Sequence, residues 1–159
     1  MDTHTRRQLL AALIVVIIVA TSFSVFFAYQ LFKPVPAYEF KTGVNHPQEI
    51  SGLINNGTVV LYFSMNDCPP CDDVAPKIAD LQSHYNGTNV TFKTFNLEDN
   101  ATSQRIFFSY GIQWVPQVFV IRPDGAVANF TMKKDSGSDS FHAMDFNAIR
   151  SAIEEARHG

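Results

Sequence analysis

The chain has 159 residues, of which 46% are hydrophobic and 17% are charged, and its net charge is −3. This length accommodates one domain with a core of reasonable size. There is no surplus of basic residues, so the sequence predicts no nucleic-acid partner, and the acidic bias is too mild to indicate a charged substrate.

A polar N-terminus at 1–8 is followed by an uncharged apolar run from Leu9 to Phe32. A helix of about 20 such residues spans the ~30 Å hydrocarbon core of a bilayer, so we predict that 9–32 is a transmembrane anchor. A buried core helix and a cleaved signal peptide are the alternatives. The run is longer than the roughly 7–15 apolar residues of a signal peptide and ends in bulky side chains. The triplet "VPA" at 35–37 is nevertheless a weak cleavage point.

The charges that flank this run predict its orientation. Arg6 and Arg7 precede it, whereas Lys33 and Lys41 follow it with Glu39 between them. The positive-inside rule then places the N-terminus in the cytoplasm and the remainder outside, as a single-pass protein of the cell membrane. The stretch "TRRQLL" also looks like a twin-arginine export signal, which would place the C-terminal part on the same side.

Five Asn-x-Ser/Thr triplets support an extracytoplasmic location. Such triplets are acceptor patterns for N-glycosylation when the middle residue is not proline. Their number exceeds what the abundance of Asn, Ser and Thr would give, although a chain merely rich in these residues remains the alternative. The candidate glycosylation sites are Asn56, Asn86, Asn89, Asn100 and Asn129.

After the anchor, three prolines predict a linker at 33–45, and 46–159 reads as one domain. Apolar residues at helical spacing alternate there with β-branched and aromatic runs, and "PDG" indicates a hairpin turn. This order predicts an α/β fold with a mixed sheet flanked by helices on both faces. The expected elements are helix 47–56, strand 58–64, helix 71–85, strand 89–97, helix 101–111, strands 116–122 and 126–132, and helix 144–159.

The two cysteines of the chain, Cys68 and Cys71, follow the strand at 58–64 and open a helix. Amide donors and the positive end of the helix dipole favour a thiolate at such a position. The spacing of three residues lets the two sulfurs form or break a bond with little backbone movement. We expect Cys68, at the exposed cap, to attack, and Cys71, one turn inside, to resolve the mixed disulfide.

Two prolines and an acidic neighbour define the rest of this active-site turn. Pro69 and Pro70 suit the first helical positions and stiffen the turn, but they also remove two amide donors. Asp67 before Cys68, and Asp72 and Asp73 after Cys71, add negative charge. These features should raise the thiol pKa and stabilise the disulfide, which predicts a reductant-leaning couple.

Three other interpretations of the cysteine pair compete with a redox site. A zinc site needs four ligands, and the histidines outside the predicted anchor are scattered. A permanent structural disulfide is possible in an oxidising compartment, but so small a loop constrains the unfolded chain little. A copper-relay site is the third alternative. We predict no metal and no cofactor other than the redox-active Cys68–Cys71 disulfide.

From about residue 46 to 159 the chain resembles the thioredoxin family. "VVLYFSMNDCPPC" is similar to the family's strand and active-site turn, Pro76 falls at its helix-kinking proline, and "FNLEDN" and Gly125 are in register. "YGIQWVPQVFVIRPDG" resembles the segment in which a proline follows a cis peptide bond. The resemblance implies that Val115–Pro116 is cis and that the Val115 backbone pairs with an extended substrate strand beside Cys68.

The chain also departs from that pattern. Asp67 replaces the family's usual tryptophan, and Pro-Pro replaces Gly-Pro. Tyr62 stands where thioredoxins have a buried acid that assists the second thiol, and its expected role is core packing. Trp114 stands where the family often has a small residue, so it either packs or shapes the substrate groove. These departures favour a membrane-tethered, extracytoplasmic thioredoxin-like protein over a cytosolic thioredoxin.

The functional prediction is a membrane-anchored thiol–disulfide oxidoreductase that acts on protein disulfides outside the cytoplasm. A reductase or isomerase role is favoured over a folding oxidase. A reductase would need a transmembrane electron donor, because one span and two cysteines cannot relay electrons. The alternative is a tethered polypeptide-binding module with inert cysteines.

Overall fold

The computed structural model describes residues 19, 21, 23, 38–134 and 141–159. The chain divides into two units, Met1–Val35 and Pro36–Gly159, and the fold below is that of the second. Within the described residues, no helix combines the length and apolar character needed to cross a bilayer. The predicted anchor at 9–32 lies almost entirely outside the described residues, so it stays a prediction.

The helices and the four strands of the main sheet follow one another in the predicted order. A short antiparallel pair, β5 and β6, follows β4 and was not predicted. Helix α3 begins at Pro69, two residues earlier than expected, because prolines already have the backbone φ of a first helical turn. The elements are α2 (Gln48–Ile54), β1 (Thr58–Ser64), α3 (Pro69–His84), β2 (Val90–Asn96), α4 (Ala101–Ser109), β3 (Gln117–Ile121), β4 (Val127–Thr131), β5 (Lys133–Lys134), β6 (Phe141–His142) and α5 (Phe146–His158).

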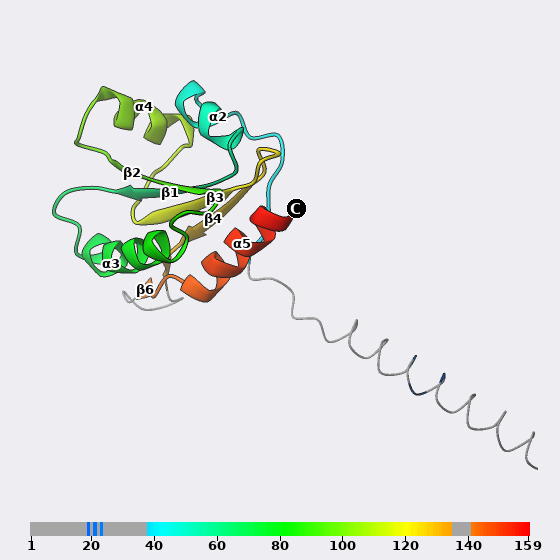
Figure 1. Ribbon diagram of the computed structural model, residues 1–159. Coiled ribbons are helices and arrows are strands. Elements are labelled where there is room, and N and C mark those ends of the chain that lie inside the picture. The colour runs from blue at the N-terminus through cyan, green and yellow to red at the C-terminus, as the bar shows by residue number, and fades with distance from the viewer. Residues whose placement is uncertain (1–18, 20, 22, 24–37, 135–140) are drawn as a thin grey trace, which may run out of the picture. The chain divides into compact units, whose positions relative to one another are not determined.

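The main sheet has four strands in the order β2-β1-β3-β4. Strand β1 runs parallel to β2 and antiparallel to β3, and β3 and β4 form an antiparallel hairpin. All seven residues of β1 are buried, as expected for a strand covered on both faces. Helices α2 and α4 lie on one face, and α3 and α5 lie on the other (Figure 1). The predicted mixed sheet with helices on both faces is confirmed.

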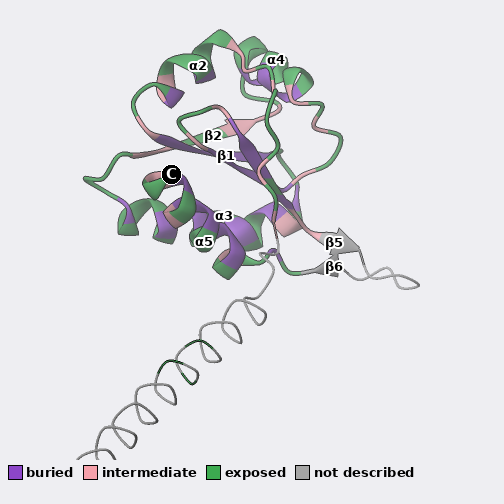
Figure 2. Ribbon diagram, turned by 90° about the vertical axis from the view of Figure 1, so that its right-hand side faces the viewer, coloured by how far each residue is buried: buried purple, intermediate pink, exposed green. Residues whose placement is uncertain are grey.

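The residues of β1 divide the core into two clusters. Side chains alternate between the faces of a strand, so Val60 and Tyr62 face α3 and α5, whereas Val59, Leu61 and Phe63 face α2 and α4. Figure 2 shows the buried layers on both sides of the sheet. The main helical contributors are Val74, Ile78, Ile149 and Ile153 in the first cluster and Ile50, Ile106 and Phe107 in the second.

The predicted linker at 33–45 extends too far toward the C-terminus. Tyr38 and Phe40 pack against the core cluster of α3 and α5. Lys41 pairs with Val127 at the edge of β4 through two backbone hydrogen bonds of 2.9 Å. The prolines of this segment suggested a linker, but its aromatic side chains bury apolar surface. The folded domain therefore begins before residue 46.

The turn before β1 closely approaches the turn before β2. The N–H of Thr58 donates to the carbonyl oxygen of Asn89 at 3.0 Å. Gly57 lies directly against that carbonyl with a φ of +140°, so a Cβ at this position would overlap the oxygen. Only glycine fits both the conformation and the space.

We predict that Gly57→Ala lowers the free energy of unfolding by about 2–4 kcal/mol, because backbone atoms must move apart. Gly52→Ala is the matched control. Gly52 lies within α2, and a Cβ there would meet nothing within 4 Å, so alanine should raise stability by up to about 1 kcal/mol. Urea unfolding of residues 36–159 measures both. Equal stability of the two variants would contradict the predicted overlap.

Candidate active site

The two cysteines lie where β1 ends and α3 begins. Cys68 is the N-cap of α3, and Pro69 and Pro70 are its first two residues. A disulfide joins Cys68 to Cys71, with 5.3 Å between their Cα atoms. The backbone N–H groups of Cys71 and Asp72 both donate to the Cys68 carbonyl, at 2.8 and 3.2 Å. The first turn of the helix therefore closes on the backbone of the cysteine that precedes it.

The expectation of an exposed Cys68 needs correction. Only 8% of its surface is exposed, against 4% for Cys71. The disulfide is the physical reason, because it ties the Cys68 side chain to a sulfur one turn inside the helix. Cys68 is still the more accessible of the two, so an incoming thiolate meets a small patch of its surface.

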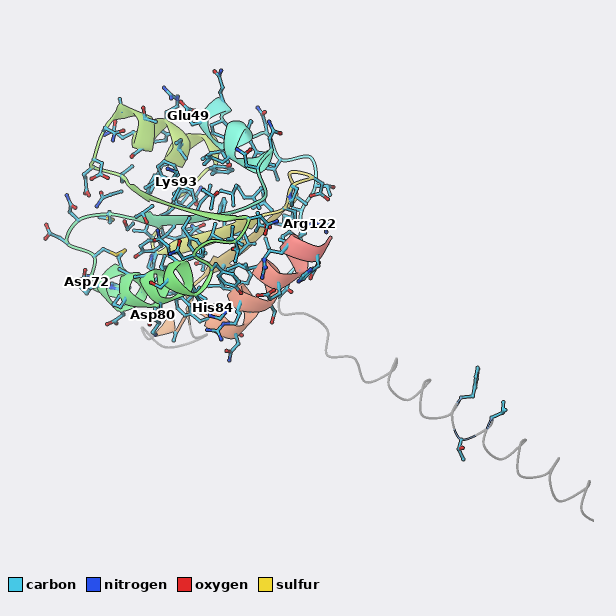
Figure 3. All side chains as sticks on the ribbon, viewed as in Figure 1. Glu49, Asp72, Asp80, His84, Lys93 and Arg122 are labelled. Atoms are coloured by element: carbon cyan, nitrogen blue, oxygen red, sulfur yellow. A yellow bond between two sulfur atoms is a disulfide. The ribbon has the colours of Figure 1, made fainter. Side chains whose placement is uncertain are left out.

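Three aspartates flank the disulfide-bearing turn in the sequence. Asp67, Asp72 and Asp73 are all exposed, and Figure 3 shows Asp72 at the start of α3. Asp67 has a φ of +50°, a left-handed conformation that aspartate tolerates better than most residues. Negative charge near the sulfurs opposes thiolate formation.

Tyr62 belongs to the core and also contacts the active site. Its buried hydroxyl donates to the Cys71 carbonyl at 3.0 Å. Burial, with a smaller contribution from the charge of Asp72, raises the pKa of Tyr62 to about 12. The phenol therefore remains protonated at neutral pH and acts as a hydrogen-bond donor. The sequence indicated the core role but gave no sign of this contact.

The second half of the site is the loop before β3. The peptide bond between Val115 and Pro116 is cis, as the family resemblance implied. Pro116 is buried, Val115 is partly buried and Trp114 is exposed. Gln117, the first residue of β3, pairs with Phe63 near the end of β1. The antiparallel register therefore brings this loop to the same end of the sheet as the cysteines.

A hydrogen-bonded ring that the sequence did not predict holds the turn between β1 and Cys68. The Asn66 N–H donates to a carboxylate oxygen of Glu98 at 2.6 Å. The Asn96 amide donates to the Asn66 side chain at 2.9 Å, and the Glu98 N–H donates to the Asn96 side chain at 3.0 Å. The turn after β2 thus fixes the turn that leads to the disulfide. "FNLEDN" carried part of the family resemblance, but nothing in it indicates a partner in another loop.

The remaining predicted positions lie outside this cluster. All five candidate glycosylation asparagines are exposed, and the side chain of Asn100 also caps α4 by accepting from Ser103 N–H at 2.9 Å. Within the part of the chain that the structure describes, no three His, Cys, Asp or Glu side chains converge to bind a metal ion.

Comparison with known proteins places this geometry in a family. The family model Thioredoxin matches residues 38–141. The chain belongs to the thioredoxin family. A thiol:disulfide interchange protein TxlA homolog from Synechocystis sp. is 24% identical over 135 residues, which are 84% of this chain and 66% of the relative. The chain therefore spans just under two thirds of the relative's length.

Solved thioredoxins share the fold. The oxidised mitochondrial thioredoxin 3 of Saccharomyces cerevisiae has 17% identity and a TM-score of 0.51, covering 67% of this chain and 87% of that one. A point mutant of thioredoxin from Halobacterium salinarum has 19% identity and a TM-score of 0.51, covering 72% and 88%. The family match and the Cys68–Cys71 disulfide identify these two residues as the Cys-x-x-Cys redox centre of a thioredoxin domain.

The hydrogen bonds among Asn66, Asn96 and Glu98 lead to a prediction about the active-site turn. Glu98→Ala removes the acceptor of the Asn66 N–H, so we expect this amide to lose protection from hydrogen exchange and the free energy of unfolding to fall by about 1 kcal/mol. Glu98→Gln keeps an acceptor oxygen, so it should retain most of the exchange protection and most of the free energy of unfolding. Exchange measured at Asn66 by NMR tests this. Equal protection in all three proteins would show that the carboxylate does not hold the turn.

Proposed function

We propose that the protein is a membrane-anchored thiol–disulfide oxidoreductase that acts on protein disulfides outside the cytoplasm. The observation that carries this proposal is the Cys68–Cys71 disulfide at the start of α3, at the same end of the sheet as a cis-proline loop. In this proposal the backbone of Val115, which precedes the cis bond, pairs with an extended substrate strand. The redox-active disulfide is the only cofactor that the reaction needs.

The reaction consists of two exchanges. In the reduced protein, the Cys68 thiolate attacks one sulfur of a substrate disulfide, forms a mixed disulfide and releases the other substrate sulfur as a thiolate. The Cys71 thiolate then attacks the Cys68 sulfur, which forms the intramolecular disulfide and releases the second substrate thiolate. Two electrons pass to the substrate, and the released thiolates take up protons.

The active-site turn favours the reductase or isomerase direction. Pro69 and Pro70 lack amide donors, and the N–H groups of Cys71 and Asp72 donate to the Cys68 carbonyl. Fewer donors therefore remain for a thiolate on Cys68, and the nearby carboxylates oppose its charge. A less stable thiolate makes the couple less oxidising. A reductase of this design receives its electrons from a transmembrane donor protein.

The proposed extracytoplasmic location rests on the sequence and on the exposure of the Asn-x-Ser/Thr triplets (sequons). The predicted anchor at 9–32 and its flanking arginines place the domain outside the cytoplasm. Five exposed Asn-x-Ser/Thr asparagines suit a surface that meets a glycosylation machinery. The alternative function, a tethered binding module with inert cysteines, is favoured only by the exposed Trp114 beside the cis-proline loop.

The catalytic proposal predicts that Cys68→Ser abolishes reduction of insulin disulfides by the full chain in detergent, because serine supplies no thiolate. Cys71→Ser should instead accumulate mixed disulfides with the substrate, visible on non-reducing gels, because the resolving thiol is gone. Wild-type activity in Cys68→Ser would overturn the enzymatic proposal and leave the binding module.

The proposed topology predicts the outcome of translation in the presence of endoplasmic-reticulum microsomes. We expect the C-terminal domain to be protected from added protease and to gain mass by glycosylation. The variant with all five sequon asparagines changed to glutamine should remain protected without that gain. Digestion of the domain in sealed microsomes would contradict the orientation, and protection without added mass would contradict use of the sequons.

A further inference from the structure

Trp114 is the single tryptophan of the chain, and 59% of its surface is exposed. It directly precedes Val115 and the cis-proline, at the end of the sheet that carries the disulfide. Scattered apolar residues are common on protein surfaces, but a large aromatic side chain at the mouth of a site is suited to contact a partner.

Hydrogen bonds hold Trp114 at both its ring and its backbone. Its indole N–H donates to the Thr131 hydroxyl oxygen at 3.1 Å. Its carbonyl accepts from the side-chain amide of Gln117 at 2.9 Å. Gln117 is buried, and its side-chain oxygen accepts from the Asn129 amide at 3.2 Å. The exposed ring is therefore anchored to β3 and β4. Because its conformation is already fixed, binding of a ligand loses little side-chain conformational entropy at this residue.

This anchoring determines what the ring can recognise. The indole N–H, its one polar group, is already used by Thr131, so the exposed remainder is an apolar aromatic face. Such a face favours aromatic rings and proline, which stack on it. Asp67 and Asp72 at the same end of the sheet disfavour acidic segments. Met65, exposed just after β1, adds further apolar surface.

We propose that Trp114 is a specificity-determining residue that selects extended polypeptides with an aromatic or proline residue within two positions of the reactive cysteine. The spacing follows from strand geometry. A substrate paired with Val115 advances about 3.3 Å per residue, so Trp114, one residue from Val115, reaches only the near neighbours of the paired position. The inference rests on the proposed function, because it concerns the substrates of that reaction.

The test uses the reduced full chain in detergent and cysteine peptides that carry thionitrobenzoate as a mixed disulfide. Attack by Cys68 on the peptide sulfur releases the coloured thionitrobenzoate thiolate, so its absorbance gives the second-order rate constant. The peptides differ only at the residues next to cysteine, which are Phe, Pro, Ser or Asp on either side. Wild type should react about 3- to 10-fold faster with the best Phe or Pro peptide than with its Ser counterpart, and slowest with Asp.

Three variants separate recognition from general structure. Trp114→Ala should reduce the Phe-to-Ser rate ratio to less than about twofold, because stacking is lost. Thr131→Val keeps the indole but removes its acceptor, so the ratio should be intermediate. Phe108→Ala removes a more exposed aromatic side chain on α4 (78%), and the ratio should remain at the wild-type value.

The outcomes distinguish this inference from the proposed function. If wild type releases thionitrobenzoate at the same rate from every peptide, the proposed role of Trp114 is wrong. The same holds if Trp114→Ala keeps the wild-type Phe-to-Ser rate ratio. Either result leaves the oxidoreductase proposal intact. The absence of release with every peptide would overturn the oxidoreductase proposal itself.

Discussion

The position of the whole site depends on β1, a strand whose residues are all buried between the helices on the two faces of the sheet. Its parallel pairing with β2 and antiparallel pairing with β3 bring three loops to one end: the turn that carries Cys68, the turn that carries Glu98 and the loop with the cis-proline. The same strand supplies Tyr62 beneath Cys71. A shift of register by one residue would move Tyr62 to the opposite face and break the link between core and site.

The sequence predicted those parts of the molecule whose signals are local. The uninterrupted β-branched and aromatic run of β1, the apolar stripe of α3 and the "PDG" turn each specify an element through their immediate neighbours. The pair of cysteines at a strand–helix junction specifies a redox site in the same way. The cis bond before Pro116 came from the family resemblance, because no local pattern of residues distinguishes it from a trans bond.

The contacts that the sequence did not predict join segments far apart in the chain. Glu98 binds Asn66 in another loop, and His46 contacts both the Tyr110 hydroxyl and the Gly125 carbonyl at 2.8 Å. Glu98, Asn66 and His46 have ordinary polar side chains outside the regular elements, so the partner of each depends on the folded register. Tyr38 was missed for a related reason, because its packing becomes visible only once the core exists.

The clearest difference between this site and the thioredoxin pattern is Tyr62, which stands where the family has a buried acidic residue. Burial keeps its pKa near 12, so it cannot accept the proton of Cys71 at neutral pH, and no Asp or Glu is buried anywhere in the described part of the domain. The proton of Cys71 must then pass to the substrate thiolate released by the first exchange or to water. Attack by Cys71 would depend on that thiolate or on water, which lengthens the life of the mixed disulfide. A long-lived mixed disulfide gives the substrate time to rearrange its own thiols, so this feature supports isomerisation within the proposed function.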